Sequence, residues 1–358
     1  MYALSNILHF FFCKISIIPL SSLHSFLKYV ILEKNKLSEV HMKNIGRYFL
    51  PILLAFSMVG CSTFNPNNSE EEPKPVDLNM NINYPLPTSF PKGNGEAIKV
   101  VLLLGQSNAS GCSIVEYLQM TAEPEDYQRY EKGYDNILIN YCIDDHAFTS
   151  NGEFVPVDLT CGSGNGFFGP EVGMADVLSK NSTEKILILK YTMSGYGLNI
   201  HWLKYGERGS IYNACQAFLS TYLTYLTAQN YQPSLRAVCW MQGESDTATK
   251  NADKYYTNQC AFASYLREDF SAYAPSTGIY FIDAGISSSP YCEPGYPTVN
   301  QAKEKFSTLS PLNIYFSTIE MGLTTLKEPY YEPDLGHYDA LCEIALGQRF
   351  GEELLKIF

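Results

Sequence analysis

From residue 98 onward, apolar runs rich in β-branched residues alternate with amphipathic stretches, and this alternation limits the folds open to the chain. The predicted buried strands are 98–104, 185–192, 235–241, 278–284 and 312–318. The predicted helices are 169–180, 211–229, 246–273, 296–307 and 338–357, and a hairpin is expected from 136–142 and 153–159. Strands alternating with helices predict a three-layer α/β/α sandwich with a central parallel sheet over residues 97–358.

Composition and charge exclude several classes of protein. The 358 residues include 20 Phe and 27 Tyr, too many aromatic residues for a low-complexity disordered chain. The net charge of −12 argues against nucleic acid as a partner, because such binding needs a basic surface. The predicted domain has no uncharged apolar stretch long enough to span a membrane, which excludes a polytopic membrane protein.

The first 60 residues are expected to be a signal and targeting segment. Residues 42–47 form a short basic region, 48–59 are largely apolar, and Gly60 precedes Cys61. This pattern resembles a bacterial lipoprotein signal, which implies lipidation at Cys61 and an anchored position in the cell envelope; an ordinary secretory signal is the alternative. We expect translation to start at Met42, although a true membrane segment within 1–41 also fits.

Residues 61–96 are rich in Pro, Asn, Ser and Glu and are predicted to form a flexible linker. Without residues 1–60 the chain keeps 19 basic and 35 acidic residues, a net charge of −16. Such a charge disfavours adhesion to anionic headgroups, so the expected membrane contact is the lipid at Cys61.

Eight cysteines remain beyond Cys61, an even number that permits disulfides in an exported protein. Cys239 lies in a predicted buried strand and is expected to be a free thiol. The absence of CxxC pairs disfavours a zinc ribbon.

Polar and glycine-rich clusters follow the predicted strands, where ligands of parallel sheets bind. The clusters are 105–111 after the first strand, 194–197, 240–246, and 334–337 before the last helix. The first cluster contains Ser107, whose hydroxyl is a weak nucleophile until a base removes its proton.

The candidate base is His337, one of three histidines beyond residue 60. Asp334 lies three residues before His337 and would accept a hydrogen bond from its Nδ1–H while Nε2 faces Ser107. The negative charge that develops on the oxygen of the tetrahedral intermediate would be stabilised by hydrogen bonds from the N–H groups of Ser107 and Gly195. A side-chain amide, either Asn108 or Gln242, would donate a further hydrogen bond.

Each of these features alone also fits a structural role, such as a turn or a helix cap. Their joint occurrence at consecutive strand ends favours a catalytic site. The 144–146 segment, Asp-Asp-His, is interpreted as a polar loop rather than a metal site, and no metal or cofactor is expected. His201 could either line the site or pack.

Five sequence blocks resemble the sialate O-acetylesterase-like branch of the SGNH hydrolases, which includes carbohydrate esterase family six and its acetylxylan esterases. The blocks are GQSN at 105–108, FGPE at 168–171, residues 190–198, WMQGESD at 240–246 and DxxH at 334–337. The resemblance covers residues 98–358. It implies a flavodoxin-like α/β/α sandwich and metal-free hydrolysis of acetyl esters on sugars.

The resemblance implies a role for each matching residue. Ser107 would be the nucleophile, His337 the base and Asp334 the acid that orients it. Gly195 and Gln242 would complete the oxyanion hole with the Ser107 N–H.

Four further residues of these blocks are candidates for supporting or substrate-binding roles: Gln106, Asn108, Glu244 and Tyr196. Two departures from the family pattern stand out. Gln242 replaces the Asn of the general SGNH pattern, and Tyr196 replaces a small hydroxyl residue and would narrow the pocket. The nucleophile elbow of α/β-hydrolases is not matched, because Ala109 stands where its second glycine would be.

The sequence thus predicts a serine esterase that removes O-acetyl groups from an acetylated polysaccharide or sialic acid. A general short-chain esterase or lipase would instead prefer longer acyl chains. A non-catalytic glycan-binding surface lipoprotein would bind sugar without releasing acetate.

Overall fold

The computed structural model describes residues 77–328 and 334–358. Every described residue belongs to one compact unit, Glu71–Phe358. The predicted signal segment 1–60, the start at Met42 and the lipidation site Cys61 therefore lie outside the described residues. No helix in the described part is both long and apolar enough to cross a membrane.

The core of the described domain is an eight-stranded sheet with the order β12-β11-β10-β1-β7-β3-β4, in which β5 also pairs with β3. The parallel strands are β1 (Ala97–Gly105), β3 (Tyr134–Ile143), β7 (Ile186–Thr192), β10 (Gln232–Met241), β11 (Tyr280–Ala284) and β12 (Asn313–Phe316). The short strands β4 (Phe148–Thr149) and β5 (Val155–Val157) run antiparallel to β3.

The order β7-β1-β10-β11-β12 corresponds to 2-1-3-4-5, the order of flavodoxin-like sheets. The expected fold class is therefore confirmed. The chain adds β3 beyond β7 as an extra parallel strand, and the short antiparallel strands β4 and β5 pair with its other side. The expected hairpin is partly realised, because β3 pairs antiparallel with β5 on one side but parallel with β7 on the other.

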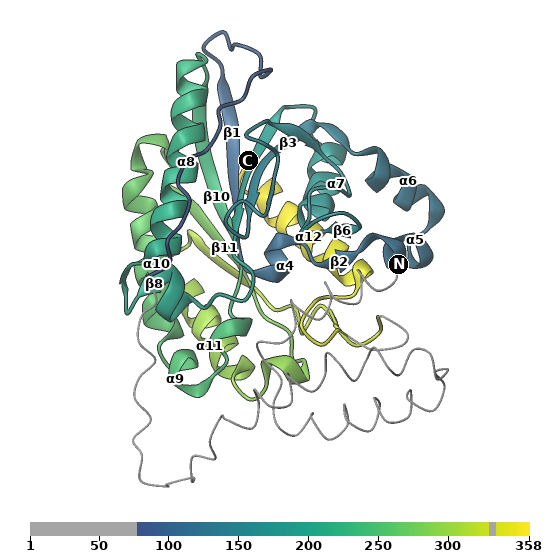
Figure 1. The fold of residues 1–358 in the computed structure, drawn as a ribbon, viewed down its shortest axis with the longest axis vertical. Helices are drawn as coiled ribbons and strands as arrows, with labels where there is room; N and C mark the ends of the chain where they lie inside the picture. Colours follow the sequence, from purple (N-terminus) through teal and green to yellow (C-terminus); the bar gives the residue numbers. More distant parts are fainter. Residues whose placement is uncertain (1–76, 329–333) are drawn as a thin grey trace, which may run out of the picture. The chain divides into compact units, whose positions relative to one another are not determined.

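Helices cover both faces of the sheet (Figure 1). On one side, α7 (Glu171–Asn181) packs against α12 (Ala340–Leu355), and α5 (Val115–Thr121) also contacts α12. On the other side lie α8 (Ser210–Ala228), α10 (Tyr255–Asp269) and α11 (Tyr296–Ser307). The burial of both sheet faces explains the nearly continuous apolar runs of the strands.

Several elements differ from the sequence prediction. The helix expected at 246–273 is divided into η2 (Glu244–Asp246), α9 (Thr249–Ala252), α10 and η3 (Ser271–Tyr273). The prediction also omitted α5 and α6 (Pro124–Lys132). Helix α6 begins with Pro124, carries acids in its first turn and bases in its last, and so had a readable signal.

The described part of the predicted linker, residues 77–96, packs against the domain. Tyr84 donates a hydrogen bond to Ala214 O at 3.0 Å, and Tyr222 donates one to Pro85 O at 2.9 Å. Phe90 packs against the hydrophobic core. The prediction of a flexible linker through residue 96 therefore fails for 77–96, because half-buried aromatic side chains of this segment pack against the core.

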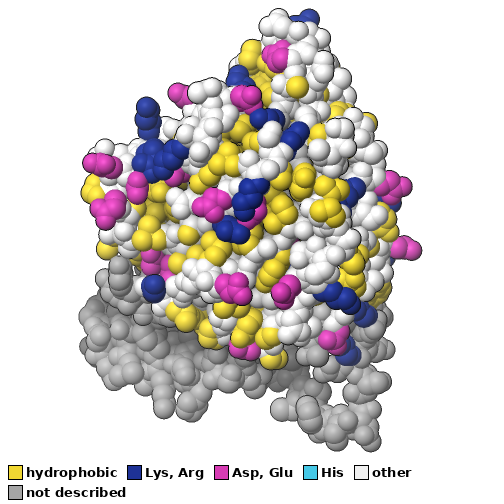
Figure 2. Space-filling view, turned by 180° about the vertical axis from the view of Figure 1, so that it is seen from behind, with side chains coloured by type: hydrophobic (Ala, Val, Ile, Leu, Met, Phe, Trp, Pro, Cys, Tyr) yellow, Lys and Arg dark blue, Asp and Glu magenta, His cyan; other side chains and the backbone are white. Residues whose placement is uncertain are grey.

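The thiols of the described residues are all unpaired, so the permitted disulfides are not formed there. Cys239 is a fully buried free thiol in β10, as predicted. Trp202 is also fully buried, with its ring centroid 5.2 Å from that of Trp240. On the face opposite to that of Figure 1, acidic and basic side chains are interspersed among apolar ones (Figure 2).

A buried ion pair joins β7 to α7. Lys190 Nζ lies 2.8 Å from Glu171 Oε2, and both side chains are fully buried. Lys190 also donates to Cys161 O at 2.9 Å, and Glu171 Oε1 accepts from the Gly169 N–H at 3.1 Å. Burial raises the pKa of Glu171, and the neighbouring ammonium opposes that rise.

We expect Lys190→Met to lower the free energy of unfolding by about 3–5 kcal/mol, because it leaves a buried carboxylate without its cation. Lys204→Met is the matched control. Lys204 pairs with Asp77 at an exposed position, and its loss should cost about 0–1 kcal/mol. Urea unfolding of both variants measures the difference, and equal losses would contradict this account of the buried pair.

Candidate active site

The site is built where three neighbouring strands end at the same level of the sheet. Gly105 of β1 pairs with Thr192 of β7 and with Met241 of β10. Backbone hydrogen bonds continue this alignment, from Gln106 N to Met241 O and from Met193 N to Gly105 O, both at 3.0 Å. The loops that carry the predicted site residues therefore begin side by side.

Gly105 permits the turn that leads to Ser107. Its φ is +150°, and a Cβ at this position would lie 1.9 Å from Met241 O. The chain then enters the short helix α4 (Ser107–Ser110). Ser107 is its first residue and is only 9% exposed.

The predicted acid–base pair is in contact. His337 Nδ1 lies 2.7 Å from Asp334 Oδ2. The turn that carries this pair is joined to α4 by Asn108, whose Nδ2 donates to Gly336 O at 3.2 Å and whose Oδ1 accepts from Tyr338 N at 3.2 Å. Asn108 thus holds the residues on both sides of His337 next to Ser107.

Among the contacts of the described residues, no hydrogen bond joins Ser107 Oγ to His337. The Cys112 side chain lies near the imidazole, and its thiol donates a hydrogen bond to Ser163 Oγ at 3.6 Å. Burial alone would lower the pKa of His337, but the hydrogen bond to Asp334 and the neighbouring Cys112 side chain outweigh it, and the pKa is raised. Sequence reasoning missed Cys112, although it lies only five residues after Ser107.

A second carboxylate, Glu244, lies beside this cluster. Its Oε1 accepts a hydrogen bond from Asn108 Nδ2 at 2.6 Å. Its Oε2 is buried and has no hydrogen-bond partner within the described part of the chain. Burial raises the pKa of Glu244, whereas the Asn108 hydrogen bond and the charges of Lys303 and His337 oppose the rise.

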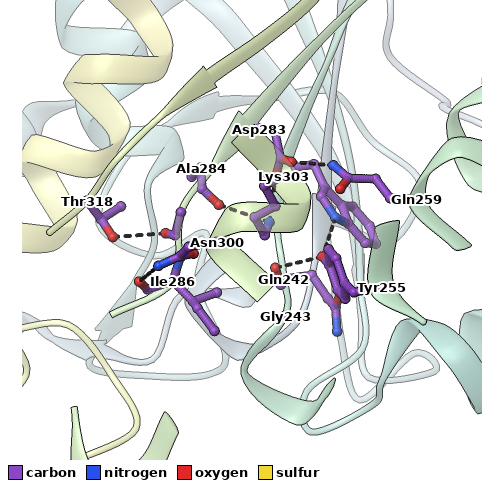
Figure 3. Close-up of polar contacts among 12 residues, drawn as sticks. Gln242, Gly243, Tyr255, Gln259, Asp283, Ala284, Ile286, Asn300, Lys303 and Thr318 are labelled. Carbon is purple, nitrogen blue, oxygen red and sulfur yellow. Dashed lines mark hydrogen bonds and ion pairs between the residues drawn. The ribbon is translucent and has the colours of Figure 1, made fainter. Parts of the chain in front are cut away.

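The amide of Gln242 is fully used within the protein. Its Oε1 accepts from Tyr255 OH at 2.9 Å, as part of the network behind the site in Figure 3. Its Nε2 donates to Asp246 Oδ2 at 2.6 Å and to Gln106 Oε1 at 3.2 Å. An amide nitrogen has two N–H donors, so both have acceptors in this arrangement.

Gln106 is itself fixed by this loop. Its Oε1 also accepts from Gly243 N at 3.4 Å and Ser245 N at 3.2 Å. Backbone N–H groups can only donate, so these contacts establish which end of the Gln106 amide faces the loop. Gln242 thereby positions the residue next to Ser107.

A buried cation compensates for the acids behind the site (Figure 3). Lys303 Nζ donates to Asp283 Oδ1 at 2.6 Å and to Ala284 O at 3.0 Å. Gln259 donates to the other oxygen of Asp283. The Lys303 charge also favours ionised Glu244 and Asp246, against the burial that raises the pKa of both carboxyls.

The loop after β7 presents Gly195 to solvent. Gly195 has a φ of +78° with no atom near a Cβ, so its conformation, rather than space, favours glycine. The preceding Ser194 N–H donates to Asp144 Oδ1 at 2.6 Å. Asp144 adopts a φ of +50°, uncommon for a residue with a side chain, and sequence reasoning did not connect it with this loop.

Tyr196 and His201 pack together in the same loop. Their ring centroids are 4.9 Å apart at an interplanar angle of 81°, and His201 Nδ1 accepts from Gly197 N at 3.1 Å. His201 thus supports the backbone that carries Gly195.

In the 144–146 segment, His146 stacks on Tyr84 at 4.9 Å. Asp145 Oδ1 accepts a hydrogen bond from Asn81 N at 3.0 Å. The described residues contain no cluster of three potential metal ligands.

The sheet order and the polar carboxyl edge define an α/β protein with an SGNH-like esterase fold. Residues 97–356 match the family described as "Carbohydrate esterase, sialic acid-specific acetylesterase". The chain belongs to this family of carbohydrate acetylesterases, which are carboxylic ester hydrolases. No curated protein matches the chain.

Solved structures share the fold. A protein from Arabidopsis thaliana superposes with a TM-score of 0.52 at 18% identity, covering 73% of this chain and 99% of its own. NanS superposes with a TM-score of 0.53 at 15% identity, covering 73% of this chain and 97% of its own.

Asp144→Ala should lower the kcat for p-nitrophenyl acetate by roughly ten- to a hundredfold, because a small misplacement of Gly195 is costly in an ester hydrolase. Asp144→Asn keeps an oxygen acceptor and tolerates positive φ, so it should restore most of the rate. Steady-state kinetics of both variants test this expectation, and their thermal unfolding serves as the control for stability. An Ala variant with normal kcat, or an Asn variant as impaired as Ala, would contradict a positioning role.

Proposed function

We propose that the protein removes O-acetyl groups from carbohydrates through Ser107, His337 and Asp334, with an acetyl-enzyme intermediate. The observation that carries the proposal is the clamp made by Asn108, which holds the His337–Asp334 turn against the helix that begins with Ser107. Family membership supplies the reaction class and the carbohydrate substrate.

In the proposed cycle, Ser107 Oγ attacks the acetyl carbonyl carbon while His337 Nε2 takes the hydroxyl proton. The ester C–O bond then breaks, and the sugar oxygen leaves with the proton from His337. A water molecule, deprotonated by His337, then attacks the acetyl carbonyl carbon. The bond from that carbon to Ser107 Oγ breaks, Ser107 takes the proton back from His337, and acetate leaves. The cycle requires His337 Nε2 to reach Ser107 Oγ, and catalytic hydrogen bonds of this kind often tighten only when substrate binds.

Two backbone donors are proposed for the oxyanion, the N–H groups of Ser107 and Gly195. The sequence prediction assigned a third donor to Gln242. Because both Gln242 N–H groups already have acceptors, we assign it a positioning role towards Gln106. Removing a donor that binds the oxyanion typically costs about 10²–10³ in rate.

Ser107→Ala should reduce the hydrolysis of p-nitrophenyl acetate by a factor on the order of 10⁴ or more, because the nucleophile is lost. Ser179→Ala, on α7 and bonded to Asn136, is the control and should keep full activity. Acetate release and circular dichroism of both proteins provide the measurement. A folded Ser107→Ala protein with wild-type activity would exclude Ser107 as nucleophile.

The pH dependence of kcat/KM tests which carboxylate is the acid partner of His337. Only the neutral imidazole can act as base, so kcat/KM should rise as the pH rises through the raised pKa of His337. Asp334→Asn removes a cause of that raised pKa, so the rising limb should move to lower pH and the plateau rate should fall. Glu244→Gln is the matched comparison. A limb displaced by Glu244→Gln and not by Asp334→Asn would show that Glu244, rather than Asp334, is the acid partner of His337.

We also propose that Cys61 carries a lipid that anchors the protein in the bacterial cell envelope. The support is the sequence alone, a basic segment followed by an apolar run and Gly60-Cys61. Metabolic labelling with palmitate should mark the wild-type chain but not Cys61→Ala. Labelling that persists in Cys61→Ala would contradict the anchor.

A further inference from the structure

A cavity of about 150 Å³ lies between the loops that follow β11 and β12. One wall is the serine run 287–289, and the other is formed by Ile319 and residues 322–326. The volume is smaller than the roughly 300–1,000 Å³ of pockets for drug-sized ligands, so it suits one small group. None of the residues discussed so far for catalysis lines it.

The serine wall is held firmly from behind (Figure 3). Asn300 clamps Ile286 with two hydrogen bonds, accepting from its N–H at 2.8 Å and donating to its carbonyl at 2.9 Å. Thr318 Oγ1 donates to Gly285 O at 2.9 Å. The loop is therefore fixed before it reaches Ser287, which favours a preformed pocket.

The lining has the chemistry of a sugar-binding surface. Ser289 is only 4% exposed, yet its Oγ has no hydrogen-bond partner among the described residues. A buried hydroxyl without a partner is uncommon in native proteins, and this one belongs to a residue that lines the cavity. The facing wall includes Leu323 and Leu326, and no charged side chain lines the cavity within the described residues.

The cavity adjoins the turn that carries the proposed base. Thr325, which lines it, donates a hydrogen bond from Oγ1 to Leu335 O at 3.3 Å, two residues before His337. Tyr291, just beyond the serine run, is 52% exposed, and its Cδ1 would lie 4.0 Å from a Cβ built on Gly336. An exposed aromatic side chain therefore lies beside the catalytic turn, two residues after the end of the serine wall.

We infer that this cavity is a subsite for an uncharged sugar unit, next to the unit that carries the acetyl group. Hydroxyls of the sugar meet Ser289 and its neighbours, and the apolar C–H face meets the leucines. The ring of Tyr291, beside the turn that carries His337, provides a surface on which a sugar ring can stack. The inference rests on the proposed function, since it takes the glycan as the substrate of the same site.

The first test measures binding without turnover. The probe is a neutral acetylated xylotetraose, titrated calorimetrically into Ser107→Ala protein. Adding Ser289→Ala should weaken binding roughly three- to tenfold, as expected for one lost hydrogen bond. Adding Ser288→Trp, at an exposed position of the lining, should weaken it further by filling the cavity, without disturbing a buried residue. Ser307→Ala, at the distant end of α11, is the matched control and should leave binding unchanged.

The second test uses proteins with Ser107 intact. In Ser289→Ala, the ratio of the KM for acetylated xylotetraose to the KM for p-nitrophenyl acetate should rise roughly three- to tenfold. Unchanged binding and an unchanged ratio in folded Ser289→Ala and Ser288→Trp proteins would overturn the subsite. An effect on O-acetylated sialic acid but not on xylotetraose would overturn its assignment to an uncharged unit. Wild-type protein that is inactive on both esters would contradict the proposed function. The subsite would still be tested in that case, because the binding measurement does not depend on turnover.

Discussion

The pairing of β1 with both β7 and β10 at Gly105 is the constraint from which the site follows. The strands end together there, and a side chain at Gly105 would collide with Met241 O. The loops that leave this point carry Ser107, Gly195 and Gln242. A shift in the register of either pairing would separate them, because neighbouring residues of a strand point to opposite faces.

Polar side chains then lock these loops together. Asn108 bridges α4 to the His337 turn, and Asp246 receives the N–H groups of Leu198 and Asn199 from the loop after β7, at 2.7 and 3.2 Å. The burial of so many acids is unfavourable unless cations or donors accompany them. Lys303 and Lys190 supply buried positive charge, and each is bonded to a carboxylate and a carbonyl.

The sequence predicted the layers of the fold and the residues that gather at the carboxyl edge, because hydrophobic periodicity and strand-end clusters are local signals. It did not predict that β3 pairs in parallel with β7, since this pairing depends on long-range contacts. Nor did it predict that residues 77–96 pack on the domain, because a polar, proline-rich composition masks the few aromatic anchors, such as Tyr84 and Phe90. No motif encodes the placement of individual side chains, so the sequence did not show that both N–H groups of the Gln242 amide already have acceptors.

The central claim is that Ser107 carries the acetyl group during turnover. Rapid acid quenching of the protein with p-nitrophenyl acetate, followed by peptide mass spectrometry, tests it directly. The account predicts one added acetyl group on the peptide containing Ser107, located on that residue, and none in Ser107→Ala protein. Acetylation of Cys112 instead, whose side chain lies near His337, would contradict it.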